Sequence, residues 1–175
     1  MNFILGLRQY CRVTIGSSLA ILCSLATVSP AQDFKVTLLG TGNPRPVMSR
    51  FGPSILIEAG KEKLIFDCGR GATQRLYQLD IPFSEITALF LTHLHSDHTV
   101  GIPDLWLTGW VMGRTAPLPV WGPEGTKAMM QHLQQAYAFD IHIRRDVDTK
   151  LPAAGAEVLA NDIDEGVVYN TAASK

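Results

Sequence analysis

Cysteine and charge of either sign are both scarce in this sequence, and each scarcity excludes a class of protein. Only three cysteines occur, so a dense disulfide framework is excluded. Charged residues make up 18% of the 175 residues, and 15 Lys and Arg nearly balance 16 Asp and Glu. The net charge of −1 excludes a strongly basic nucleic-acid coat protein and an acidic tail protein. The hydrophobic share of 46% is too high for a disordered chain.

The first 31 residues contain no Asp or Glu, and their only charged side chains are Arg8 and Arg12. Residues 13–28 are almost wholly apolar or small, and small residues follow as far as Ala31. This pattern predicts a secretory signal peptide, 1–31, that is cut after Ala31. The alternative is an uncleaved anchor, but the apolar stretch is short for a span of about 20 residues. We therefore expect a periplasmic or secreted protein that does not associate with the membrane after cleavage.

The rest of the chain predicts strands and helices in alternation, which is typical of an α/β domain. Apolar or β-branched runs predict the strands, and apolar residues at helical spacing predict the helices. The predicted helices cover 71–79, 102–112 and 125–138. The predicted strands cover 34–39, 54–59, 63–67, 88–92, 117–121, 141–145 and 157–160, and a further one begins at 166–169.

Three of the five histidines lie within six residues, directly after the predicted strand 88–92. In an extended stretch His93 and His95 project to the same side, so both imidazoles can contact one cation. If the chain then turns, Asp97 and His98 can point to a second position nearby. Imidazole nitrogens with one carboxylate suit zinc, and less selectively iron or manganese. The alternatives are a solvated His-rich loop and a structural metal site, but structural zinc favours cysteine ligands and this cluster has none.

The segment 93–98 reads His-x-His-x-Asp-His, and in this it resembles the metal-binding signature of the metallo-β-lactamase fold. The likeness extends from about Lys35 to Tyr169. Further segments resemble the ribonuclease Z and arylsulfatase-like branch of that superfamily, namely 39–46, 50–54, 66–71, 101–105 and 121–123.

The resemblance implies a four-layer αβ/βα sandwich with two Zn²⁺ ions in a complete domain. By the match to the signature, His93 and His95 hold the first ion, and Asp97 and His98 hold the second. Two such ions about 3.5–4 Å apart lower the pKa of a bridging water and bind the attacking and leaving oxygens. The resemblance assigns Asp97 the catalytic role of orienting that water and taking its proton. The implied reaction is hydrolysis of a phosphodiester, a sulfate ester or an acyl or lactone bond in a small-molecule or ester substrate.

The family's site needs three further ligands, a His, a bridging Asp and a final His, for which the sequence after Val167 offers no candidates. We therefore expect 32–175 to correspond to the N-terminal αβ half of such a domain. One apolar sheet face is then uncovered, and the chain by itself has little activity.

Several neighbouring residues have a structural and a functional interpretation. Asp67, at the end of a predicted strand, either orients a metal-bound His or caps a turn. The tryptophans of 102–112, and Trp121, are core residues rather than the lining of an aromatic pocket. His132 and His142 are surface or packing residues. Cys68, the only cysteine after the predicted signal, is expected to be buried.

Two other functions compete with an exported metallo-hydrolase. One is a ribonuclease Z-like endoribonuclease that processes tRNA precursors. The predicted export signal and an acidic mature chain weigh against it, so nucleic acid is not the expected partner. The other is a non-catalytic exported metal-binding module. The sequence does not specify an oligomeric state.

Overall fold

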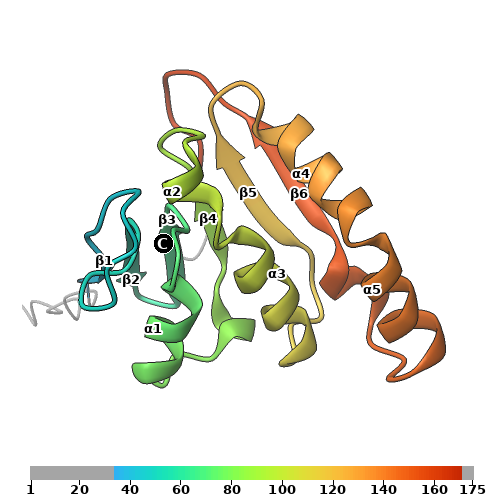
Figure 1. The fold of residues 1–175 in the computed structure, drawn as a ribbon. Coiled ribbons are helices and arrows are strands. Elements are labelled where there is room, and N and C mark those ends of the chain that lie inside the picture. Colours follow the sequence, from blue (N-terminus) through green and yellow to red (C-terminus); the bar gives the residue numbers. More distant parts are fainter. Residues whose placement is uncertain (1–33, 171–175) are drawn as a thin grey trace, which may run out of the picture. The chain divides into compact units, whose positions relative to one another are not determined.

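A computed structural model describes residues 34–170, in which a six-stranded sheet follows the chain order from β1 to β6 (Figure 1). The predicted signal peptide and its cut after Ala31 lie outside the described residues and stay predictions. Strands β1, β2 and β3 pair antiparallel, and β4, β5 and β6 continue the sheet parallel to β3. The strands are β1 (Phe34–Gly40), β2 (Ser54–Ala59), β3 (Glu62–Phe66), β4 (Ala88–Phe90), β5 (Leu118–Gly122) and β6 (Val158–Asp162).

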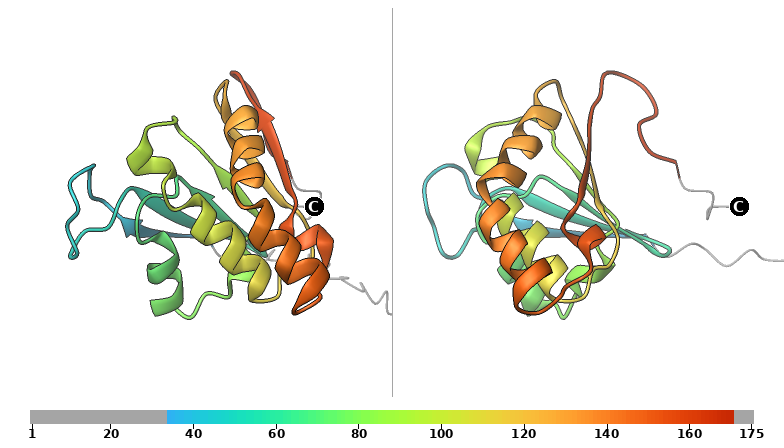
Figure 2. Two further views of the ribbon diagram at one scale, coloured as in Figure 1. Left: turned by 45° about the vertical axis from the view of Figure 1, so that its right-hand side comes forward. Right: turned by 90° about the vertical axis from the view of Figure 1, so that its right-hand side faces the viewer.

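The helices lie on one face of this sheet, as the views in Figure 2 show. They are α1 (Ala72–Gln78), α2 (Ser96–Thr99), α3 (Ile102–Val111), α4 (Thr126–Ala136) and α5 (Ala138–His142). Within residues 34–170, no helix is both long enough and apolar enough to cross a membrane. The mixed sheet and its helices confirm the predicted α/β class.

The core lies between the helices and the sheet. Alternate strand residues point into it and meet the apolar faces of the helices. Trp106 and Trp110 of α3 are fully buried there, and their indole N–H groups donate to the carbonyls of Ala156 and Pro152. These two tryptophans are core residues, as predicted. The largest buried side chains include Leu39, Leu56, Ile65, Leu76, Leu89, Leu105, Leu118, Val120 and Met130.

The opposite face of the sheet is apolar, and no helix of residues 34–170 covers it. At its β1 edge Phe34, Val36 and Leu38 are 68%, 51% and 62% exposed. Farther along, the rings of Phe66, Phe90 and Trp121 stack with centroid distances of 4.9 and 5.2 Å. Trp121 thus belongs to this face rather than to the buried core.

Tyr169, in the segment after β6, lies against this apolar face. Its ring meets Phe90 and Trp121 edge-on, at 5.5 and 5.2 Å between centroids. Its hydroxyl donates to the Glu62 carboxylate at 2.8 Å. Burial and this hydrogen bond raise the pKa of Tyr169 to about 12. The segment has no strand partner, so the strand predicted to begin at 166–169 is wrong.

The strand predicted over 141–145 is also wrong, because these residues are helical. The alternation of Ile and polar residues suggested a strand. In the structure Arg144 Nε donates to both carboxylate oxygens of Asp140 at 2.9 and 3.0 Å, and His142 pairs with Asp146 at 2.8 Å. Both are i,i+4 pairs, which stabilise helix. The helix predicted over 125–138 is present as α4. It ends at Ala136, and a second helix, α5, begins after Tyr137.

Candidate metal centre

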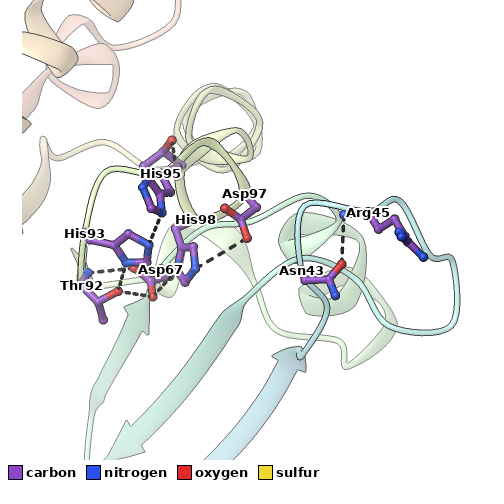
Figure 3. A network of polar contacts seen from close by, with 9 residues as sticks. Asn43, Arg45, Asp67, Thr92, His93, His95, Asp97 and His98 are labelled. Carbon is purple, nitrogen blue, oxygen red and sulfur yellow. Dashed lines mark hydrogen bonds and ion pairs between the residues drawn. The ribbon is translucent and has the colours of Figure 1, made fainter.

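The four candidate ligands lie on one loop at the carboxyl end of β4 (Figure 3). Because β3 to β6 are parallel, their carboxyl ends meet at the same edge of the sheet, where α/β proteins bind ligands. His93 and His95 precede the short helix α2, and Asp97 and His98 lie within it. The chain therefore turns after His95, as the second pair of predicted ligands requires.

His93 and His95 turn their ring nitrogens toward each other. Nε2 of His93 lies 3.1 Å from Nδ1 of His95, and the ring centroids are 4.7 Å apart. The His98 ring also lies beside His93, with a centroid distance of 4.0 Å. Three imidazoles are thus gathered within one small volume.

His98 is oriented by a buried carboxylate from a different strand. Its Nδ1 lies 2.8 Å from Oδ2 of Asp67, so Nδ1 donates to that carboxylate and Nε2 is the ring nitrogen left to contact a metal. That Nε2 lies 3.8 Å from Oδ2 of Asp97. His98 and Asp97 thus form a second pair of potential ligands beside His93 and His95.

Asp67 also binds Thr92, which follows β4 and precedes the histidines. It is 7% exposed, and its carboxylate accepts hydrogen bonds from the backbone N–H and the hydroxyl of Thr92 at 2.8 and 2.7 Å. Its φ of 58° lies in the left-handed region, which a non-glycine residue adopts at a cost of about 1 kcal/mol. Of the two roles that the sequence left open, the structure shows the contact with a His of the cluster, while the bonds to Thr92 join two strand ends rather than cap a turn.

Comparison with known proteins shows the family to which the chain belongs. A family model described as Anti-Pycsar protein Apyc1 matches residues 34–137, which is more than half of the chain. The chain belongs to this family. Ribonuclease Z of Mycolicibacterium gilvum is a relative with 40% identity over 142 residues, which cover 77% of this chain and 48% of the relative.

Solved structures place the Apyc1-family chain in a fold. Human tRNase Z, short form, has 31% identity and a TM-score of 0.54, covering 59% of this chain and 39% of that one. The metallo-beta-lactamase fold protein YhfI of Bacillus subtilis has 26% identity and a TM-score of 0.50, covering 57% and 42%. The chain therefore has the metallo-β-lactamase fold, in its ribonuclease Z-like branch, and its relatives indicate a family of hydrolases. It spans about half the length of the ribonuclease Z relatives it matches.

The loop of this Apyc1-family member is set in a closely packed backbone frame. A Cβ on Gly69 would lie 2.4 Å from the carbonyl oxygen of Asp97 and 2.6 Å from the carbonyl carbon of Gly52. A Cβ on Gly101 would lie 2.4 Å from the carbonyl oxygen of Gly69. Three chain segments therefore touch backbone to backbone beneath the histidines, which only glycine permits.

Cys68 contributes to this frame through its backbone and not through its thiol. Its N–H donates to the carbonyl of His98 at 2.7 Å, and its carbonyl accepts from the N–H of Gly101 at 2.9 Å. The side chain is fully buried, as predicted. Burial, and then the charges of Asp104 and Asp67, raises the pKa of the thiol. The protonated thiol is neither a metal ligand nor a nucleophile.

The imidazole nitrogens and the carboxylate of the loop are suitable ligands for a divalent cation, although their present arrangement does not surround a single metal position. Within residues 34–170, no group of three or more His, Cys, Asp or Glu side chains surrounds a common metal position. The ring nitrogens of His93 and His95 nevertheless face each other, and His98 presents a free nitrogen toward Asp97. These four residues can hold a metal, and Asp67 acts on them through His98.

The remaining histidines take no part in this cluster. His132 is exposed on α4, and His142 pairs with Asp146 on α5. They are surface residues, in agreement with their predicted role, although His142 lies on a helix and not on a strand. Asp67 is the residue whose contribution the spacing of the histidines does not reveal, because it lies 31 residues before His98.

Proposed function

We propose that the loop of His93, His95, Asp97 and His98 binds zinc and serves the hydrolysis of a phosphodiester bond. The carrying observation is the pairing of His93 with His95 and of His98 with Asp97 at the edge of the parallel strands. Zinc–nitrogen bonds are about 2.0–2.1 Å long, so two nitrogens on one tetrahedral zinc lie about 3.3 Å apart. The separation of 3.1 Å between His93 Nε2 and His95 Nδ1 is close to this value.

When bound, zinc supplies Lewis acidity that activates water and stabilises charge on a phosphoryl oxygen. The chain's own residues position the reacting groups. Asp67 accepts from Nδ1 of His98, which fixes the ring so that its Nε2 lies on the side of Asp97. Asp97 keeps an 11% exposed side chain, so its carboxylate can receive a proton from an attacking water.

A phosphodiester is favoured over a sulfate ester or an acyl bond because the relatives are ribonucleases. A ribonuclease cleaves a phosphodiester, and none of these relatives is named for the other two reactions. This also supports RNA as a form of the substrate, which keeps the ribonuclease Z-like activity as a second candidate. This chain spans about half the length of these relatives, so we propose the phosphodiester as the substrate class of the whole enzyme.

Zinc binding is the first test, because it does not require turnover. After equilibrium dialysis against Zn²⁺, the 175-residue protein is expected to retain zinc by mass spectrometry. His93→Ala and His98→Ala should each lower the bound zinc. His132→Ala and His142→Ala change exposed histidines outside the loop and should leave it unchanged. Equal losses in all four variants would contradict a site on this loop.

Substrate class is tested by rate acceleration over the uncatalysed reaction in zinc-loaded protein. Bis(p-nitrophenyl) phosphate, p-nitrophenyl sulfate and p-nitrophenyl acetate are compared, with a 3′-extended tRNA as a fourth substrate. We expect slow turnover with the largest acceleration for the phosphodiester. Asp97→Ala should reduce it by about 100-fold, the typical effect of losing a general base. A larger acceleration of the sulfate or acetate would contradict the proposed substrate class.

A further inference from the structure

A second pocket, with a volume of about 270 Å³, lies between strand β1, the loop that follows it and helix α1. Arg50 and Arg75 line it together with apolar side chains that include Phe51 and Leu79. No Asp or Glu lines the pocket, and none of the candidate metal ligands does. Its charge is therefore of one sign.

Arg75 is held in place by neutral groups. Its guanidinium lies over the ring of Phe51, 4.7 Å from the centroid, and its Nη1 donates to Oε1 of Gln78 at 2.7 Å. Gly71 also lies against this ring, since a Cβ on Gly71 would lie 2.4 Å from Cγ of Phe51. These contacts fix the guanidinium without neutralising it.

Arg50 is fixed in the same way. Its Nη2 donates to the carbonyl of Thr41 at 2.7 Å, and its Nε lies 3.2 Å from the Thr41 hydroxyl. No carboxylate of residues 34–170 forms an ion pair with Arg50 or Arg75. Each guanidinium has five N–H donors, so both keep donors that no described group accepts.

We propose that this pocket binds the phosphate group of a small organic phosphate monoester. Two oriented, uncompensated guanidinium groups match the oxygens and the charge of a phosphate. The volume lies just below the usual range for ligand pockets and limits the organic part to a small group. Leu79 and the neighbouring leucines give that part an apolar wall.

This site is separate from the proposed catalytic one but linked to it by a short piece of chain. Arg50 and Phe51 line the pocket, while a Cβ on Gly52 would lie 3.1 Å from the carbonyl oxygen of Asp97. A ligand in the pocket therefore contacts residues directly adjacent to the frame of the metal loop. The assignment does not depend on the proposed function.

Calorimetric titration of the full 175-residue protein tests the proposal. Metal is first removed with a chelator, so that phosphate cannot bind through zinc. Inorganic phosphate and phenyl phosphate are the two probes, which distinguish free phosphate from an organic monoester. Phenyl phosphate is expected to bind more tightly, and Arg50→Gln and Arg75→Gln should each weaken it at least tenfold. Tighter binding of inorganic phosphate would overturn the organic part of the assignment.

Arg45→Gln is the matched control, because Arg45 carries the same charge on the same loop but does not line the pocket. It should change affinity less than twofold. An equal loss in this variant would show diffuse attraction by the loop, and would overturn the proposal. Binding that is lost in His98→Ala and kept in the two pocket variants would do so as well.

A further variant tests the Arg75 charge without removing either arginine, in case the arginine variants do not fold. Gln78→Glu leaves both arginines in place and sets a carboxylate where Arg75 already donates. It is expected to weaken phenyl phosphate at least fivefold while the thermal melting curve is retained. Unchanged binding in folded Gln78→Glu protein would contradict a role for the Arg75 charge.

Discussion

At the scale of single residues, Asp67 joins the sheet to the candidate metal loop. One oxygen of its carboxylate accepts from the Thr92 backbone, and the other accepts from the Thr92 hydroxyl and from His98. These hydrogen bonds offset the unfavourable left-handed backbone at Asp67. Asp67 thus adopts an unfavourable backbone conformation in which its carboxylate can orient His98.

Asp67→Asn is expected to weaken zinc binding by about 10- to 100-fold, the usual effect of losing a carboxylate that orients a ligating histidine. The amide replaces one accepting oxygen by a donor, so it cannot satisfy both Thr92 and the His98 N–H. Competition with a chromophoric chelator measures the affinity. Asp104→Asn is the control, since Asp104 lies on α3 and, among residues 34–170, accepts only from Gln74 and Thr108. Equal affinities in the two variants would contradict this role.

At the scale of elements, the sequence predicted what depends on local pattern. The four candidate ligands stand within six residues, so their spacing alone brings them together. The contact of Asp67 with His98, and the pairing of Arg50 with Arg75 in one pocket, join residues 31 and 25 positions apart. Tertiary packing decides such contacts, so the sequence offered Asp67 only as one of two alternatives, without its partner His98, and did not indicate the arginine pocket.

The wrong strand at 141–145 has a local cause. Its Ile-His-Ile alternation has the period of a strand, yet the same residues form two i,i+4 ion pairs that a strand cannot make. Helix also continues directly from α4 through α5. A period of two over five residues was weaker evidence than these pairs.

Gly69→Ala is expected to destabilise the fold by about 1–3 kcal/mol, the usual cost of inserting a methyl group into a packed region. The new Cβ meets backbone atoms of Asp97 and Gly52, which cannot rotate away. Urea unfolding measures the change. Gly113→Ala is the control: its Cβ meets nothing within 4 Å, so only its backbone φ of 107° carries a cost, about 1 kcal/mol.

The two glycine variants also differ in their effect on metal binding. Gly69→Ala displaces the backbone at Asp97 and should weaken zinc binding, whereas Gly113→Ala lies at the end of α3 and should not. Equal stability and equal zinc affinity in both variants would show that the close backbone contact is unimportant.

At the scale of the whole described region, the sheet has one face packed against helices and one apolar face without them. The exposed side chains of β1 and the stacked rings of Phe66, Phe90 and Trp121 form a continuous row across the paired strands. Contiguous apolar surface of this kind marks a site of association. No helix of residues 34–170 covers this face, in line with the expectation, although Tyr169 packs on Phe90 and Trp121.

The full-length chain is expected to bind a hydrophobic dye such as ANS, with enhanced fluorescence in the folded state. The double variant Val36→Lys and Leu38→Lys should reduce that signal by about half, because it places charge on the exposed edge of the face. Phe139→Lys changes a 79% exposed side chain on α5 and serves as the control. An equal reduction by the control would contradict dye binding on this face.

The strand order has a consequence for how the chain folds. Each strand pairs with the strands directly before and after it in the sequence, so no late strand must be inserted between earlier ones. Such sequential pairing limits each closure to one connection, which is shortest in the β2–β3 hairpin and longer in the parallel strand–helix units. The β1–β2–β3 meander can form first, and each later strand–helix unit can add to its free edge. Assembly from the N-terminus is thus built into the topology.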